Sequence, residues 1–121
     1  IYEISLGETI GVAVPDEIAS LLDCLLEDIP PGQLAGHYHD TRGTALPNVF
    51  RSLEYGLTTF DSSAGGLGGC PYAPGAAGNL ATEALVYTLE RSGYSTSINL
   101  NDLRAASGKI QGFVSRALRT F

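Results

Sequence analysis

The stretch Leu34-Ala35-Gly36-His37-Tyr38-His39-Asp40-Thr41-Arg42-Gly43 decides the fold of the chain, because a short strand-like run passes directly into a polar loop. The run from Leu34 to His39 predicts a strand, and a helix is expected after the loop. The apolar residues of that helix recur on one face at spacings of three and four: Leu46, Val49, Phe50 and Leu53. The stretch therefore predicts a unit of strand, loop and helix.

A similar unit precedes this stretch. A strand is expected over residues 2–6, followed by a polar loop and a helix that begins near Pro15. Proline suits the first turn of a helix, and the two prolines at positions 30 and 31 would end it. The apolar face of this helix comprises Ile18, Leu21, Leu22, Leu25, Leu26 and Ile29. The spacing predicts an amphipathic helix packed on the sheet.

A third unit follows. A strand over about residues 57–61 leads into a glycine-rich run, and a helix is expected from about residue 79 to residue 91. A terminal helical region over about residues 100–118 is expected to break near Gly108. The chain thus alternates strands and helices throughout.

Strands that alternate with helices at this length pair in parallel through crossover connections. Two architectures fit, a doubly wound sheet and a (β/α)8 barrel, and in both the chemistry gathers at the carboxyl ends of the strands. A barrel needs about 250 residues, so three units would form roughly its last third. The chain begins on a strand and has no methionine, so we expect residues 1–121 to be the C-terminal part of a single barrel domain.

Composition limits the function. The chain has 121 residues, a net charge of −6 and 44% hydrophobic residues, which indicates a folded acidic protein and argues against nucleic-acid binding. No apolar run approaches the roughly 20 residues of a membrane span, so no membrane association is expected. The two cysteines, Cys24 and Cys70, do not make a disulfide framework and favour a reducing compartment.

The two histidines of the chain, His37 and His39, lie at the end of the middle strand. Residues two apart on a strand point to the same side, so both imidazoles would face one site while Tyr38 faces the helix layer. Two imidazoles on one face are a common way to hold a divalent metal. The alternative interpretation is a hydrogen-bonded polar pair inside a barrel.

The run from Gly65 to Asn79 contains Cys70 and is rich in glycine. Long ordered loops are usually functional, and glycine lets the backbone approach a ligand closely. Cys70 also fits a buried core thiol or a Cys-His nucleophile pair. A phosphate cradle is disfavoured because no lysine lies near the run. By position alone Asn79 is a helix cap, Asp61 ends a strand, and Glu8 is a loop residue.

Three segments resemble the C-terminal part of the 3-hydroxy-3-methylglutaryl-CoA lyase family, and together they cover nearly the whole chain. The first is Ile4-Ser5-Leu6-Gly7-Glu8-Thr9-Ile10-Gly11, and the second is His37-Tyr38-His39-Asp40-Thr41-Arg42-Gly43. The third is Gly66-Leu67-Gly68-Gly69-Cys70-Pro71-Tyr72-Ala73, continuing through Gly78-Asn79-Leu80-Ala81-Thr82-Glu83. The third segment is long and typical of that lyase.

The resemblance implies a (β/α)8 barrel that cleaves 3-hydroxy-3-methylglutaryl-CoA to acetyl-CoA and acetoacetate with Mg²⁺ or Mn²⁺. It implies that His37, His39 and Asn79 are metal ligands, and that Cys70 and His37 are catalytic. Gly68 and Gly69 would belong to the loop beside an acyl-CoA substrate. It further implies a homodimer in the intact protein, in the cytoplasm or the mitochondrial matrix.

The resemblance also leaves gaps. Glu8 stands where the family usually has aspartate, and the family's remaining metal ligand and catalytic glutamate would lie upstream of Ile1. Because three strands cannot close a barrel, we expect these residues alone to be inactive. Two other interpretations stay open: an acyl-CoA condensing synthase of the same superfamily, and a non-catalytic fragment that only binds metal.

Overall fold

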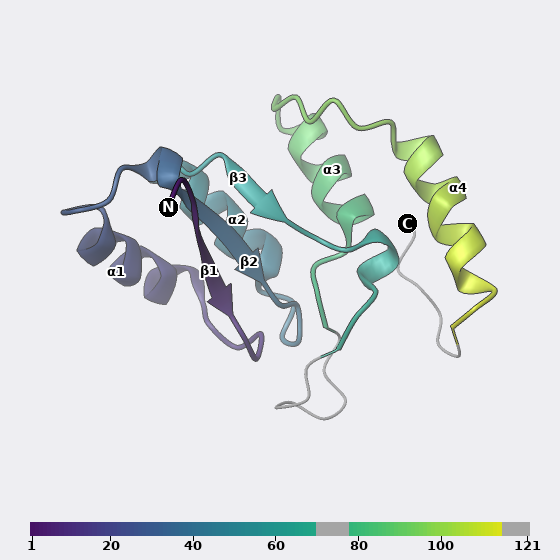
Figure 1. The fold of residues 1–121 in the computed structure, drawn as a ribbon, viewed down its shortest axis with the longest axis horizontal. Coiled ribbons are helices and arrows are strands. Elements are labelled where there is room, and N and C mark those ends of the chain that lie inside the picture. Colours follow the sequence, from purple (N-terminus) through teal and green to yellow (C-terminus); the bar gives the residue numbers. More distant parts are fainter. Residues whose placement is uncertain (70–77, 115–121) are drawn as a thin grey trace.

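Three parallel strands form one sheet in the order β1-β2-β3 (Figure 1). They are β1 (Ile4–Glu8), β2 (Leu34–Tyr38) and β3 (Thr59–Asp61) in a computed structural model that describes residues 1–69 and 78–114. The middle strand β2 pairs with both neighbours. The predicted parallel α/β arrangement is confirmed, and in the described part of the chain β1 and β3 each have one unpaired edge.

Four helices accompany the sheet in the described residues: α1 (Pro15–Leu25), α2 (Ala45–Glu54), α3 (Thr82–Arg91) and α4 (Leu100–Gln111). Two 3₁₀ turns, η1 (Pro31–Gln33) and η2 (Ala64–Gly66), precede β2 and follow β3. Helices α1 and α2 pack together and share the core with β2, whereas α3 and α4 lie side by side beyond β3 (Figure 1). No described helix is long and apolar enough to cross a membrane.

Tyr38 joins the sheet to the helix layer. Its side chain is 3% exposed, and its hydroxyl shares a 2.7 Å hydrogen bond with the hydroxyl of Ser52 on α2. Burial raises the pKa of the Tyr38 hydroxyl, an effect that the bond to Ser52 partly offsets, so the phenol stays neutral. Gly36 leaves space beside it, because a Cβ there would lie 2.7 Å from Phe60. The prediction that Tyr38 faces the helices is confirmed.

The opposite face of the sheet is made of small and polar residues. Residues in register in a parallel sheet point to the same side, so the pairing assigns them to this face: Ser5, Gly7, Ala35, His37, Thr59 and Asp61. None of them is a large apolar residue. This second face is therefore where a polar site can form.

Several predicted boundaries were wrong. β1 runs to Glu8 instead of ending at residue 6, because Gly7 and Glu8 continue the pairing with β2. β3 begins at Thr59, and α4 passes through Gly108 without a break. Residues 115–121, where the predicted terminal helix was to end, lie outside the described residues.

One predicted core residue of α1 was also wrong. Leu21 is 45% exposed, although Ile18 and Leu22 beside it are buried. Leu21 lines a cavity of about 350 Å³ beside β1, together with Leu6 and Ile18. No strand pairs with the outer edge of β1 in the described chain, so nothing covers this part of the helix.

A fully buried glutamate ties α4 to the turn after β3. Glu83 on α3 is 0% exposed, and its Oε2 accepts a 2.8 Å hydrogen bond from the backbone N–H of Gly65 in η2. Its Oε1 accepts a hydrogen bond from the hydroxyl of Ser107 on α4, which is also fully buried. One side chain thus satisfies donors from two other elements, as a buried polar group must.

We expect Glu83→Ala to lower the free energy of unfolding by on the order of 3 kcal/mol, because both donors lose their acceptor. Ser107→Ala removes one donor and should cost less than half as much. Urea unfolding followed by circular dichroism measures both changes. Equal stability of Glu83→Ala and the parent protein would contradict the role assigned to this contact.

Candidate metal and catalytic site

The imidazole of His37, in β2, and that of His39, directly after the strand, meet on the polar face of the sheet. The Nε2 atoms of His37 and His39 are 3.3 Å apart, and the ring centroids are 5.2 Å apart. His39 is 7% exposed, whereas the side chain of His37 is 35% exposed. The predicted common orientation is therefore confirmed, and the two Nε2 atoms lie within hydrogen-bond distance of each other, which also fits the alternative of a hydrogen-bonded pair.

Asp61 is the second partner of His37. Register places Asp61 directly beside His37, at the end of β3. The Nδ1 of His37 lies 2.5 Å from Oδ1 of Asp61, so a ring N–H donates to the carboxylate. The sequence suggested only that Asp61 ends a strand. The signal that would have found it is the register of β3 against β2, which the strand pattern alone does not supply.

Asn79 lies opposite His39. The two residues form an isolated antiparallel bridge, flanked by hydrogen bonds from Asp40 N–H to Gly78 O at 2.9 Å and from Leu80 N–H to Tyr38 O at 3.3 Å. This pattern is the non-hydrogen-bonded pair, in which the facing side chains approach most closely. Asn79 thus joins the histidine pair through a long-range contact.

The interpretation of Asn79 as a helix cap was wrong. The residue at the N-cap of α3 is Ala81, and the helix begins at Thr82. The Asn79 Nδ2 instead donates a 3.1 Å hydrogen bond to the carbonyl of Leu67. Its Oδ1 is buried and has no hydrogen-bond partner among the described residues. The amide is therefore fixed on one side and leaves an acceptor oxygen unused.

Two glycines close the base of the glycine-rich segment. A Cβ on Gly78 would lie 2.4 Å from the carbonyl oxygen of Gly68, and a Cβ on Gly68 would lie 2.6 Å from Nδ2 of Asn79. Both have positive φ, +115° at Gly68 and +80° at Gly78. Gly69 is exposed, and apart from its chain neighbours no atom of the described residues lies within 4 Å of the position of its Cβ. Cys70 lies outside the described residues.

The neighbouring loops meet at the same end of the sheet. Arg42 N–H donates to the carbonyl of Gly11 at 3.0 Å, and Asp40 accepts a 3.2 Å bond from the N–H of Ala45 at the start of α2. Glu8 is a strand residue and not a loop residue. It is in register with Tyr38, on the helix side of the sheet, and its Oε2 is buried without a partner among the described residues.

The side chains at this site are of the types that bind divalent cations. Imidazole nitrogens and an amide oxygen are suitable ligands, and one of these atoms, Asn79 Oδ1, is buried without a partner among the described residues. No three His, Cys, Asp or Glu side chains within residues 1–69 and 78–114 lie close enough together to hold a metal ion. The described residues thus offer donor atoms of a suitable kind but no such group of three.

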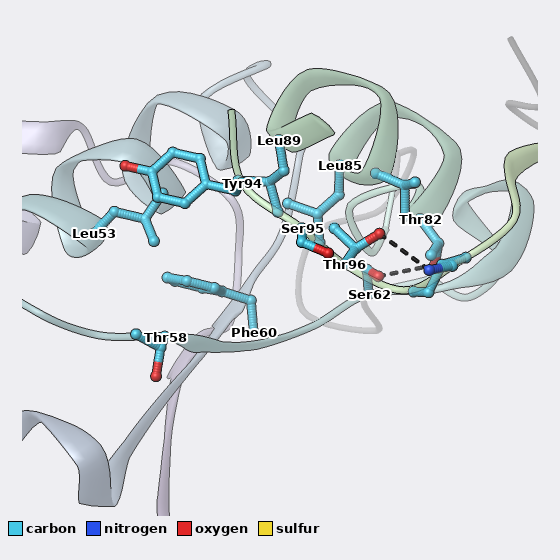
Figure 2. Close-up of a pocket in the computed structure, with 12 residues that line it drawn as sticks. Leu53, Thr58, Phe60, Ser62, Thr82, Leu85, Leu89, Tyr94, Ser95 and Thr96 are labelled. Atoms are coloured by element: carbon cyan, nitrogen blue, oxygen red, sulfur yellow. Dashed lines mark hydrogen bonds between the residues drawn. The ribbon is translucent and has the colours of Figure 1, made fainter. Parts of the chain in front are cut away.

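A separate cavity lies away from these residues. It has a volume of about 430 Å³ and is lined by side chains from α2, β3, α3 and the segment before α4, as Figure 2 shows. Phe60 and Tyr94 are among its aromatic residues, and none of the predicted site residues lines it. It lies behind the sheet and not at the histidine pair, because Phe60 is in register with Gly36 on the helix side.

Comparison with known proteins identifies the family. Residues 1–110 match the family model described as HMGL-like. The chain belongs to the HMGL-like family. It is 50% identical over 118 residues to the hydroxymethylglutaryl-CoA lyase YngG of Bacillus subtilis, covering 98% of this chain and 40% of that protein.

Solved HMG-CoA lyases have the same arrangement. The structure of the Bacillus subtilis HMG-CoA lyase matches 98% of the chain with a TM-score of 0.94 and 50% identity. An HMG-CoA lyase from Acinetobacter baumannii, solved in complex with coenzyme A and 3-methylmalate, matches 98% of the chain with a TM-score of 0.89 and 40% identity. These matches cover 40% and 39% of the two structures, so the HMGL-like chain spans about two fifths of its relatives' length.

The family match does not separate the two predicted compartments. Human lyases named as mitochondrial and as cytoplasmic are both about half identical to this chain, at 50% and 52%.

The contact between Gly68 and Gly78 gives a test of the site's geometry. Gly78→Ala should destabilise the protein by roughly 1–3 kcal/mol, because the new Cβ adds backbone strain and collides with Gly68. It should also displace Asn79. Gly69→Ala is the matched control and should leave the unfolding midpoint in urea unchanged. Equal midpoints for the two variants would show that this contact does not form.

Proposed function

We propose that the protein containing this chain is a carbon–carbon lyase that cleaves 3-hydroxy-3-methylglutaryl-CoA to acetyl-CoA and acetoacetate. The carrying observation is 50% identity to the Bacillus subtilis lyase over 98% of the chain. The coenzyme A and 3-methylmalate bound to the Acinetobacter baumannii lyase support an acyl-CoA substrate. We further infer a homodimer, located in the cytoplasm or the mitochondrial matrix.

We infer that residues 1–121 are the C-terminal part of one (β/α)8 barrel domain. The three strands are parallel, both outer strands have an edge that no described residue pairs with, and the polar residues lie at the carboxyl ends of the strands. A barrel would pair both edges and enclose the small polar face that carries His37. The TM-score of 0.94 against a lyase of which the chain covers 40% supports this interpretation.

We propose that His37, His39 and Asn79 hold a divalent cation, Mg²⁺ or Mn²⁺, with further ligands from elsewhere in the protein. The converging Nε2 atoms and the unpartnered Oδ1 support this ligand set. A bound cation would hold substrate oxygens and make the tertiary hydroxyl more acidic. The proposed ligands come from the end of β2 and from the bridge opposite it, so the backbone pairing fixes their spacing.

The reaction requires two proton movements. The hydroxyl at C3 loses its proton, the C2–C3 bond breaks to leave acetoacetate, and its electron pair passes to the enolate of acetyl-CoA. We propose that His37 takes part in removing the hydroxyl proton and that the Cys70 thiol delivers a proton to the enolate carbon. A segment that closes over the substrate would exclude water and protect the enolate.

His37 has two proposed roles that use the same atom. Its Nδ1 is committed to Asp61, which leaves Nε2 as the nitrogen able to bind a cation or accept a proton. One lone pair serves one partner at a time, so ligation and proton transfer must fall at different steps. His39 lacks a carboxylate partner among the described residues and is proposed as a ligand only.

We expect His37→Ala and Cys70→Ala to lower kcat by about 10²–10⁴-fold, because each removes a proton-transfer group. The assay measures acetoacetate released from 3-hydroxy-3-methylglutaryl-CoA by the full-length protein. Cys24→Ala is the matched control for the thiol, since Cys24 is exposed on α1, and should keep full activity. Near-normal turnover of either site variant, or synthesis from acetyl-CoA and a 2-keto acid instead of cleavage, would overturn the assignment.

Removal of divalent metal should abolish cleavage, and addition of Mn²⁺ or Mg²⁺ should restore it. Dialysis against a chelator followed by metal titration, with acetoacetate as the readout, measures this. His39→Ala should require much higher metal concentrations for the same recovery, because it loses one proposed ligand. Full activity of the chelated protein would exclude a cation from the reaction.

A further inference from the structure

Asp61 is a charged residue of the polar face to which neither the sequence nor the proposed reaction gives a task. It is the last residue of β3, and its side chain is 57% exposed. Exposed surface carboxylates are usually free in solution. This one instead lies 2.5 Å from the ring nitrogen of His37, on the neighbouring strand.

The contact has a defined chemical consequence. A carboxylate accepts hydrogen bonds, so the Nδ1 of His37 must carry the proton that it shares with Asp61. In the neutral ring the other nitrogen, Nε2, then holds the lone pair. This is the nitrogen that faces the Nε2 of His39 at 3.3 Å. The position of Asp61 therefore selects which nitrogen of His37 is available at the site.

The two histidines differ in this respect. The Nδ1 of His39 is buried and has no hydrogen-bond partner among the described residues. The ring of His37 is more exposed, at 35%, so it has more freedom to rotate unless something holds it. Among the described residues, Asp61 thus holds the ring of His37, the more exposed of the two. Strand register makes the contact rigid, because His37 and Asp61 are paired residues of β2 and β3.

We propose that Asp61 is a positioning residue that fixes the ring and tautomer of His37, so that Nε2 presents a lone pair to a divalent cation. This inference rests on the proposed metal-dependent function. Carboxylates that hold a ligating imidazole typically strengthen metal binding by about 10–100-fold. Asp61 touches neither cation nor substrate in this role and acts only through His37.

The first test uses the unmodified full-length protein without metal. Two-dimensional ¹H–¹⁵N correlation spectra report which nitrogen of each histidine carries hydrogen, and comparison with the spectrum of His37→Gln assigns the signals of His37. The expected result is a single tautomer with hydrogen on Nδ1. Hydrogen on Nε2, or a mixture of both tautomers, overturns the proposal even if no Asp61 variant can be folded.

The second test measures Mn²⁺ binding by calorimetry. Asp61→Asn keeps the size of the side chain and removes the carboxylate, and it should weaken Mn²⁺ binding by about 10–100-fold and mix the His37 tautomers. Asp61→Glu retains a carboxylate and should recover part of the affinity. Thr59→Val, two residues away on the same face of β3, and Asp102→Asn on α4 are controls for the strand and for the charge, and both should bind like the parent.

The outcomes separate this inference from the proposed function. Unchanged Mn²⁺ affinity and an unchanged His37 tautomer in Asp61→Asn would overturn the positioning role. Loss of affinity in the controls as well as in Asp61→Asn would do the same, because the effect would then be general. A parent protein that shows the Nδ1–H tautomer and the Asp61-dependent affinity, yet does not cleave 3-hydroxy-3-methylglutaryl-CoA, would support the inference while refuting the lyase.

Discussion

The pairing of β2 with strands on both sides is the constraint on which the rest of the described structure depends. It gives the middle strand two faces with different surroundings. Tyr38 on one face is buried against α2, and its neighbours in sequence therefore face the other way. Because Tyr38 cannot leave the helix layer without breaking its bond to Ser52, the two histidines are held on the polar face. Packing on one side of the sheet thus orients the chemistry on the other.

The parts of this arrangement that depend on local pattern could be predicted from the sequence. The two-residue period of a strand places His37 and His39 together, and the same period sends Tyr38 to the helices. The spacing of apolar residues locates α1 and α2 to within a few residues. These features follow from a few neighbouring residues, and they were found without knowledge of the fold.

The parts that depend on distant pairing could not be predicted from pattern. Asparagine is a residue type that is favoured at helix caps. Only the bridge from Asn79 to His39, forty residues earlier, shows that it lies elsewhere. Asp61 needs the register of β3 against β2 before its contact with His37 becomes visible. The exposure of Leu21 does not follow from the spacing of its helix, because Leu21 lies beside the edge of β1 that no described strand pairs with. Resemblance to a family supplied the proposed role of Asn79 but not the role proposed for Asp61.

Because Gly68 and Gly78 are in close contact, the stability of the sheet depends little on the residues between them. Its two ends are already held together by the fold, through the bond of Asn79 to Leu67 and the bridge to His39. The entropy cost of joining two fixed points rises only slowly with the number of residues between them. Changes in the length or sequence of the intervening residues should therefore have little effect on the stability of the sheet. Selection on this segment can therefore act on its proposed catalytic role almost independently of folding.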